Sequence, residues 1–273
     1  MSRQIILDIC QGEGINVKVL SRGWLFRLEK DGKIRYMFKN CLPLNSQSSS
    51  AIAADKFATF EVLRAAGIPI IDHSILYPFD NHREFADGCN TPSYLERYFK
   101  EHQHDIVLKP NHGLGGQGIT HITSADQFPA ALEAAFAYSE SASLCPFYHI
   151  SREYRIVMLD GEARLVYGKE RSADWRFNLQ NGAVSIDVTD PTLRAKLVML
   201  AKKVVQELNL RFCSVDVIEL DSSHHHASSS DQPELLVIEV NSTVSTSHYL
   251  EQHPDQTALV QDIYRDVIRK IFA

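Results

Sequence analysis

The sequence predicts an α+β protein built of two halves behind a short β-rich segment. Helix-type and strand-type patterns are mixed along the chain, without the strict alternation of a parallel α/β fold and without an internal repeat. A length of 273 residues, 44% of them hydrophobic, suffices for two medium domains with substantial cores. We place the three segments at residues 1–50, 51–143 and 144–273.

The first segment is expected to form short strands and turns. Val17–Leu20 and Trp24–Leu28 are rich in strand-forming residues, and Asp31-Gly32 is a hairpin signal before a third such run at Ile34–Phe38. The polar stretch Asn45–Ser50 predicts a linker or loop, which ends this segment.

The second segment begins with a helix that Asp55-Lys56 opens, and this helix should end at Gly67 because Pro69 follows. Its apolar face consists of Phe57, Phe60, Leu63 and Ala66. Three further elements are expected after it: a helix starting at Thr91-Pro92, a strand over Asp105–Lys109, and an Ala-rich helix from Ser124 to about Ser139.

The third segment opens with a hairpin, in which Asp160-Gly161 joins Tyr154–Leu159 to Arg164–Tyr167. Asp190-Pro191 should start a long helix that runs to about Glu207. Two apolar strands follow, and a final helix carries an apolar stripe, consisting of Leu259, Ile263, Val267, Ile268 and Ile271.

Composition excludes several classes of protein. A formal net charge of -6 argues against a broad nucleic-acid-binding surface. No apolar run reaches the length of a membrane span, and no basic segment precedes an apolar stretch at the N-terminus, so we expect a cytoplasmic protein. The five cysteines are scattered without a CxxC pair, which favours reduced core thiols over disulfides or a zinc site. A catalytic cysteine is the alternative.

Polar residues interrupt the two late apolar strands. Asp216 lies within Phe212–Ile218, and Glu239 and Asn241 end the run that begins at Leu235, where alternation puts these two side chains on one face. If the strands pair, Asp216 meets them there. Two carboxylates about 4 Å apart repel by roughly 4 kcal/mol at a dielectric constant of 20, so the arrangement needs a cation. Three oxygen ligands with phosphates suit Mg²⁺.

Histidines 224–226 lie between these strands in a serine-rich stretch. A solvated loop is the favoured interpretation, and a metal-binding tract is the alternative.

A glycine-rich turn is the second chemical signal. Lys109 ends a strand, and Gly113, Gly115, Gly116 and Gly118 follow before the strand-like Ile119–Ile122. Glycines let backbone amides approach an anion closely, so Lys109–Ile119 is expected to form a flap that closes over a triphosphate. The order of residues excludes a Walker A loop, and an ordinary hairpin without a ligand is the alternative.

The ordered set of motifs resembles the ATP-grasp enzymes, and most of all the RimK-like carboxylate–amine ligases, including the ligase domain of cyanophycin synthetases. The resemblance covers roughly residues 50–250. It is carried by Lys109-Pro110-x-x-Gly113-x-x-Gly116-x-Gly118, Glu153-Tyr154-Arg155, Arg176-Phe177-Asn178, Asp216 and Glu239-Val240-Asn241. It implies an ATP-grasp fold, in which a subdomain with the flap (51–143) and a subdomain with the metal site (144–273) grip ATP.

The resemblance also implies roles for single residues. Lys56 and Lys109 would contact ATP phosphates, together with Gly113, Gly116 and Gly118. The alternative for Lys56 is an ordinary surface lysine.

The stretch Phe147-Tyr148 is similar to the hinge whose backbone pairs with adenine, although core aromatics are the alternative. Glu153 would lie near the ribose and Arg155 would support the site, unless both are surface strand charges.

Asp216, Glu239 and Asn241 would bind Mg²⁺, with Mn²⁺ as an alternative ion. Lys169, Arg176 and Asn178 would line the acyl-phosphate end and act in catalysis. A charged loop between strands is the alternative for this stretch.

Two departures from the RimK-like pattern limit what the resemblance implies. No Pro-Gly follows Asn241, so the amine cannot be inferred. The part that precedes the first helix is shorter than usual, so part of the substrate pocket is expected to be missing or to be supplied by a partner subunit, and a homodimer is possible.

The sequence thus predicts an ATP-dependent ligase that joins a small carboxylate, such as an amino acid or peptide, to an amine through an acyl phosphate. A small-molecule kinase on the same scaffold and a nucleotide-binding regulatory module without turnover are the alternatives.

Overall fold

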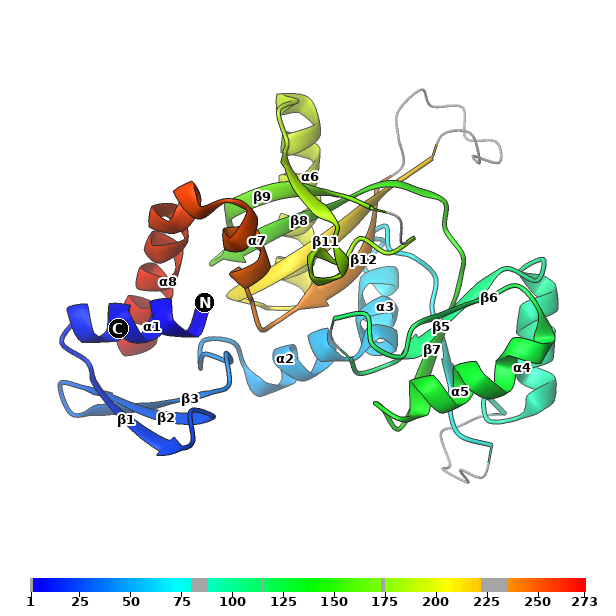
Figure 1. Ribbon diagram of the computed structural model, residues 1–273, viewed down its shortest axis with the longest axis horizontal. Helices are drawn as coiled ribbons and strands as arrows, with labels where there is room; N and C mark the ends of the chain where they lie inside the picture. Colours follow the sequence, from blue (N-terminus) through cyan, green and yellow to red (C-terminus); the bar gives the residue numbers. More distant parts are fainter. Residues whose placement is uncertain (1, 80–87, 114, 173–174, 222–234) are drawn as a thin grey trace. The chain divides into compact units, whose positions relative to one another are not determined.

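The computed structural model describes residues 2–79, 88–113, 115–172, 175–221 and 235–273 (Figure 1). The chain forms two compact units, and each unit is made of non-consecutive segments. The first unit comprises Met1–Ala51, Arg152–Val217 and Val240–Ala273, and the second comprises Ile52–Ser151 and Ile218–Glu239. The mixture of helices and sheets confirms the α+β class. None of the helices in the described ranges combines the length and hydrophobicity of a membrane span.

The first unit begins with helix α1 (Ser2–Gly12), which the sequence analysis did not predict. Three antiparallel strands follow in the order β1-β2-β3, as predicted: β1 (Asn16–Ser21), β2 (Leu25–Lys30) and β3 (Lys33–Phe38). Asp31 and Gly32 form the turn between β2 and β3 with φ of 47° and 75°.

Helix α2 (Gln47–Ala54) corrects a second prediction, since this stretch was expected to be a linker or loop. Its first turn is stabilised by the Ser46 hydroxyl, which accepts a hydrogen bond from the Ser49 amide at 3.1 Å. Ser49 and Ala53 are buried, so packing holds a helix that has little apolar surface of its own.

A five-stranded sheet has the order β10-β9-β8-β11-β12. It contains β8 (Ile150–Leu159), β9 (Glu162–Glu170), β10 (Val184–Asp187), β11 (Phe212–Leu220) and β12 (Leu235–Asn241). The predicted hairpin is confirmed, because β8 and β9 are antiparallel and Asp160 and Gly161 turn between them with φ of 47° and 80°. The two strands of the predicted metal site, β11 and β12, are neighbours.

Three α-helices accompany this sheet. Helix α6 (Pro191–Glu207) begins where the sequence predicts, because the Asp190 carboxylate accepts a hydrogen bond from the Thr192 amide at 2.8 Å. The short helices η3 (Leu179–Asn181), α7 (Ser247–Gln252) and η5 (Pro254–Gln256) precede the predicted closing helix, α8 (Thr257–Phe272).

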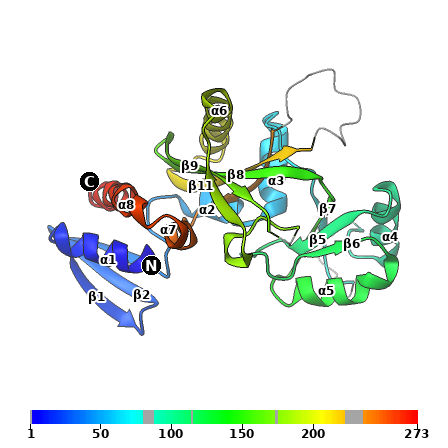
Figure 2. The same cartoon turned by 45° about the horizontal axis from the view of Figure 1, so that its top comes forward.

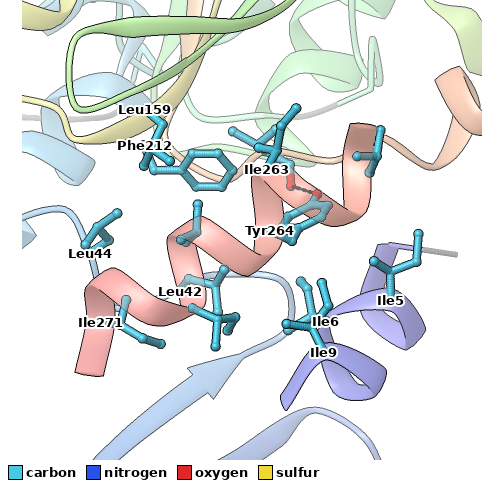
Figure 3. Packing of buried hydrophobic residues seen from close by; sticks show 14 of the residues in the cluster. Ile5, Ile6, Ile9, Leu42, Leu44, Leu159, Phe212, Ile263, Tyr264 and Ile271 are labelled. Carbon is cyan, nitrogen blue, oxygen red and sulfur yellow. Dashed lines mark hydrogen bonds between the residues drawn. The ribbon is translucent and has the colours of Figure 1, made fainter. Parts of the chain in front are cut away.

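The core of the first unit lies between α1, α8 and the five-stranded sheet. Figure 3 shows Ile6 and Ile9 of α1 near Tyr264 of α8, and Phe212 of β11 near Ile263. The Tyr264 hydroxyl donates a hydrogen bond to the Val244 carbonyl at 3.1 Å, so its polar end is satisfied inside the core.

The second unit contains a four-stranded sheet of order β4-β7-β5-β6. Its strands are β4 (Ser74–Leu76), β5 (Ile106–Pro110), β6 (Thr120–Ile122) and β7 (Ala142–Pro146). Its helices are α3 (Lys56–Ala65), α4 (Pro92–Glu101), η2 (Ala125–Gln127) and α5 (Phe128–Phe136). Helices α4 and α5 lie beside this sheet and share its core (Figure 2).

The helices of this unit begin where the sequence predicts, although the last of them starts with a 3₁₀ turn. Asp55 caps α3 and Thr91 caps α4. Ser124 and Gln127 form a capping box, as the sequence indicates, but the first turn is the 3₁₀ helix η2 and the following α5 ends at Phe136, before the predicted Ser139.

Candidate functional site

Two lysines of the second unit, Lys109 buried and Lys56 partly buried, lie close together with one carboxylate. Lys56 begins α3 and Lys109 lies in β5, where it is 6% exposed. The Lys56 ammonium is 3.5 Å from the Glu239 carboxylate and donates a hydrogen bond to the Gly113 carbonyl at 3.3 Å. We call Lys56, Lys109, Asn111, Gly113 and Glu239 the lysine cluster. Two cations and one carboxylate leave it with a surplus of positive charge, which suits an anion.

The charges of this cluster act on its own titratable groups. Burial lowers the pKa of Lys56, Lys109 lowers it further, and Glu239 only partly opposes them. His73 is buried beside the cluster, and burial together with Lys109 and Lys56 holds its pKa well below the ordinary value. His73 is therefore a neutral side chain, and its Nδ1 lies 2.6 Å from the Ser143 hydroxyl.

Asn111 joins the segments that carry the two lysines. Its carbonyl accepts a hydrogen bond from the Lys56 amide at 3.3 Å, and its side-chain Oδ1 accepts one from the Phe57 amide at 3.0 Å. The side chain is fully buried, and Nδ2 has no hydrogen-bond partner among the described residues. An orphaned donor beside two ammonium groups indicates that a negatively charged or acceptor group belongs here.

The glycine-rich flap pairs as predicted, because β5 and β6 are antiparallel. Gly115, Gly116 and Gly118 have φ of 72°, 76° and 69°, in the region that favours glycine. Packing is a second reason why position 118 requires glycine, since an added Cβ there would lie 2.7 Å from the Ala134 carbonyl oxygen. Residue 114 lies outside the described residues.

The predicted adenine hinge lies between β7 and β8. Phe147 is partly buried, stacks on His121 with ring centroids 3.9 Å apart, and donates its amide to the Asp105 carbonyl at 3.1 Å. The Tyr148 hydroxyl accepts a hydrogen bond from the Asp72 amide at 3.0 Å. The side chains of this segment are thus part of the packing of the second unit. His121 was not singled out from the sequence.

In the first unit, four predicted site residues form a buried charge cluster: Glu153 and Arg155 of β8, Lys169 of β9 and Asp216 of β11. Arg155 holds Asp216 through two hydrogen bonds, Nε to Oδ1 at 2.7 Å and a terminal nitrogen to Oδ2 at 2.5 Å. Lys169 pairs with Glu153 and lies 3.4 Å from Asp216. The charges balance, and the side chains of Lys169 and Asp216 are 4% and 3% exposed.

Electrostatics favour the ionised forms of Asp216 and Lys169, whereas burial raises the pKa of Glu153 in the same cluster. Burial acts to raise the pKa of Asp216, but Arg155 and Lys169 outweigh it and hold that pKa below its ordinary value. For Lys169, burial and Arg155 act to lower the pKa, and the two carboxylates outweigh them and raise it.

The three predicted metal ligands fall in different units: Asp216 and Asn241 in the first, and Glu239 in the second. Two carboxylates and an amide oxygen are hard donors, and that chemistry fits Mg²⁺. Both carboxylates have protein cations as partners, Asp216 with Arg155 and Lys169, and Glu239 with Lys56. Within the described ranges, no group of three or more His, Cys, Asp or Glu side chains is arranged to hold a metal ion. Histidines 224–226 lie outside the described residues.

The remaining predicted residues follow β9. Arg176 is partly buried, and Asn178 begins η3, where its carbonyl accepts hydrogen bonds from the amides of Asn181 at 2.9 Å and Ala183 at 3.3 Å. These bonds assign the Asn178 backbone to shaping the turn.

Comparisons with known proteins show what the chain is similar to. Residues 89–222 match the family model described as "Prokaryotic glutathione synthetase, ATP-grasp domain". The chain is 29% identical over 92 residues to the D-alanine–D-alanine ligase of Lactobacillus acidophilus, which covers 34% of this chain and 24% of that protein. It is 32% identical over 112 residues to the cyanophycin synthetase of Trichormus variabilis, which covers 41% and 11%. The matches thus span less than a third of these relatives' own length.

Solved structures show the same fold. The D-alanine–D-alanine ligase from Bacillus anthracis complexed with ATP has a TM-score of 0.59 at 17% identity, covering 83% of this chain and 68% of that one. A bifunctional glutathione synthetase from Pasteurella multocida has a TM-score of 0.54 at 17% identity, covering 93% and 44%. Together with the family match over residues 89–222, these likenesses show an ATP-grasp fold and make the chain similar to ATP-grasp carboxylate–amine ligases.

Proposed function

We propose that this protein is an ATP-dependent ligase that joins a small carboxylate to an amine, with release of ADP and phosphate. The lysine cluster is the observation that carries the proposal. It holds one buried and one partly buried ammonium group and an orphaned amide donor beside a glycine-rich flap, in a chain whose relatives are ATP-grasp ligases.

In this proposal, Lys56 and Lys109 neutralise ATP phosphates, and the backbone amides of Gly113, Gly116 and Gly118 approach them closely. The backbone of Phe147 and Tyr148 would pair with adenine, and Glu153 would lie near the ribose.

Asp216, Glu239 and Asn241 are the residues that would hold Mg²⁺ or Mn²⁺. The bound ion supplies neutralisation of phosphate charge. Arg155 holds the Asp216 carboxylate in a fixed orientation through two hydrogen bonds. The pairing of Lys169 with two carboxylates favours a positioning role for this lysine as well.

The proposed reaction has two steps. A carboxylate oxygen of the substrate forms a bond to the γ-phosphorus while the bond between that phosphorus and the bridging oxygen breaks, which releases ADP. The amine nitrogen then attacks the acyl carbon, phosphate leaves with the bonding electrons, and the amine loses a proton. Arg176 and Asn178 are proposed to contact the acyl-phosphate end, where a guanidinium stabilises the charge spread over its oxygens.

We propose the substrates by chemical class: the carboxylate is an amino acid or a peptide, and the acceptor is an amine. Because ATP is the co-substrate, we place the reaction in the cytoplasm. The flap would exclude water, since an acyl phosphate is readily hydrolysed.

Hydroxylamine trapping tests the proposal. The protein is incubated with Mg²⁺–ATP, hydroxylamine and a panel of amino acids and peptides, and we expect a hydroxamate formed in step with ADP. Phosphorylation of a hydroxyl would instead indicate a kinase, and tight ATP binding without ADP would indicate a binding module. Either result contradicts the ligase.

Glu239→Gln should lower turnover by about a hundredfold or more, because it removes one charge that the ion requires, worth several kcal/mol. Glu207→Gln, a change at an exposed residue that ends α6, is the control and should leave turnover unchanged. Thermal unfolding should show that both variants are folded. Near-normal turnover of the Glu239 variant would count against the assigned site.

A further inference from the structure

The three-stranded sheet of the first unit has one covered face and one exposed face. Phe26, Leu28 and Met37 are buried and belong to the core that α1 and α8 share. The opposite face, which we call the outer face, carries the alternate residues of β2 and β3. Figure 1 shows the three strands together near α1.

The outer face is unusually apolar. Along β3, Ile34, Tyr36 and Phe38 are 42%, 51% and 55% exposed, and Trp24 is 53% exposed. The Lys39 ammonium lies 5.0 Å from the Trp24 ring and 5.6 Å from the Phe38 ring, so both rings lie at one end of the stripe.

An aromatic side chain buries about 150–250 Å² when it is covered, so three that are half exposed leave about 300 Å² of contiguous apolar surface. That is within the size range of the largest apolar patch on an ordinary monomer, a patch that is often functional.

Charges on the outer face alternate along β2. Arg27 pairs across the sheet with Tyr36, and Glu29 pairs with Ile34. Arg27 and Glu29 are also joined by an ion pair of 2.6 Å, and their side chains are 25% and 36% exposed.

This pattern is complementary to itself. Consider two copies of the sheet packed outer face to outer face and related by a two-fold axis. The axis lies between the two faces, runs perpendicular to the strands and passes at the level of Leu28, so position 27 of each copy lies opposite position 29 of the other. It therefore brings Arg27 of one copy opposite Glu29 of the other, twice over. The same axis brings Tyr36 opposite Ile34.

The rest of the face agrees with this axis. Lys18, the cross-strand partner of Arg27 on β1, is brought opposite Asn16, so no like charges meet there. Lys39 at one end of the stripe is brought toward Asp31 in the turn at the other end. Two sheets packed in this way lie about 10 Å apart with interleaved side chains.

We propose that the outer face binds the outer face of a second copy of this chain, which forms a two-fold homodimer. An identical copy matches the alternating charges by symmetry and places Tyr36 opposite Ile34, whereas a partner of different sequence would have to supply both. The proposal does not depend on the ligase activity.

Mixing of charge variants tests the proposed geometry. Arg27→Glu places two acids on each face, and Glu29→Arg places two bases. Each variant alone should therefore have a dimer dissociation constant at least about tenfold higher than that of the natural chain. An equal mixture should form a heterodimer, because every position 27 then meets an opposite charge at position 29. The double variant Arg27→Glu/Glu29→Arg should dimerise like the natural chain. Sedimentation velocity and native mass spectrometry give these populations.

Apolar variants test the stripe independently. Tyr36→Glu should abolish the dimer, whereas Met199→Glu, at a residue that is 57% exposed on α6, should not. Circular dichroism should show that all variants are folded. A natural chain that stays monomeric at 100 times the protein concentration used for activity overturns the proposal. It is also overturned if the mixed charge variants fail to pair, or if the dimer persists with Tyr36→Glu.

Discussion

Asp160 connects three parts of the first unit through one carboxylate. It lies in the turn between β8 and β9, accepts a hydrogen bond from Arg211 Nε at 2.7 Å, and pairs with Lys270 of α8 at 2.7 Å. The hydrogen bond from Arg211, the one from Lys270 and the charges of both lower the pKa of Asp160 to about 2. The ionised form is therefore favoured in the folded chain.

This low pKa predicts how stability depends on pH. A carboxyl group whose folded-state pKa lies below its unfolded value adds stability above the unfolded pKa, near 4, and loses it as the pH falls toward 2. The side chain is 29% exposed, so solvent screening reduces the effect to about 1 kcal/mol. Asp160→Asn should lower the free energy of unfolding by about this amount at pH 7, and the difference should shrink below about pH 4.

Urea unfolding at pH 7 and pH 3 measures the difference, with Asp255→Asn, at an exposed acid, as the control. A difference between Asp160→Asn and the natural chain that is as large at pH 3 as at pH 7 would show that the carboxylate charge is not responsible.

At the same scale, the candidate site divides into residues that the sequence predicted and residues that only the fold shows. Lys56 and Lys109 could be singled out because each stands in a short motif with its neighbours. Asn111 could not, since its side chain bonds to the Phe57 amide, 54 positions away in the sequence. Nor does any pattern along one strand reveal that Arg155 of β8 holds Asp216 of β11, because that pairing depends on strand order.

At the scale of elements, the flap shows two separate demands on glycine. Gly118 has a positive φ, and an added Cβ would meet the Ala134 carbonyl oxygen at 2.7 Å. Gly32, in the turn between β2 and β3, has a similar φ of 75° but nothing within 4 Å of an added Cβ. The two positions therefore separate the cost of backbone conformation from the cost of a steric clash.

Gly32→Ala should lower the free energy of unfolding by about 1 kcal/mol, the cost of a left-handed backbone for a residue with a Cβ. Gly118→Ala should cost about 2–4 kcal/mol, since the helix carrying Ala134 must also move. Urea unfolding of the two variants measures both values. Equal losses would show that α5 adjusts to the methyl group without cost.

The elements that the sequence predicted correctly are those with a local signal. Asp55, Thr91 and Asp190 cap helices where they were expected, and Asp160-Gly161 turns a hairpin. Helix α1 was missed although its buried Ile5, Ile6, Ile9 and Cys10 recur with helical spacing. Helix α2 is serine-rich, so composition pointed to a loop, and tertiary packing of Ser49 and Ala53 decided the outcome.

At the scale of the whole molecule, the two units are interleaved in the sequence. Strands β8, β11 and β12 each contribute residues to both units, so each unit depends on segments that pass through the other. We therefore expect one cooperative thermal transition. Such a chain responds as a whole to a ligand that binds only its folded state.

Mg²⁺–ATP at about 100 times its Kd should add about 2.7 kcal/mol to the free energy of unfolding. For a chain of this size that corresponds to a rise in Tm of about 5–10 °C. Differential scanning fluorimetry measures the rise without a carboxylate substrate. Removing the metal with EDTA should reduce it, because the phosphate charge then loses the cation that would neutralise it.

Lys109→Ala should remove most of this rise, since it deletes the buried one of the two ammonium groups of the lysine cluster. Lys202→Ala, at a lysine on α6 whose side chain is 47% exposed, should keep the rise intact. If both variants gain the same Tm on addition of Mg²⁺–ATP, the nucleotide binds somewhere other than the lysine cluster, because only one of the two substitutions touches it.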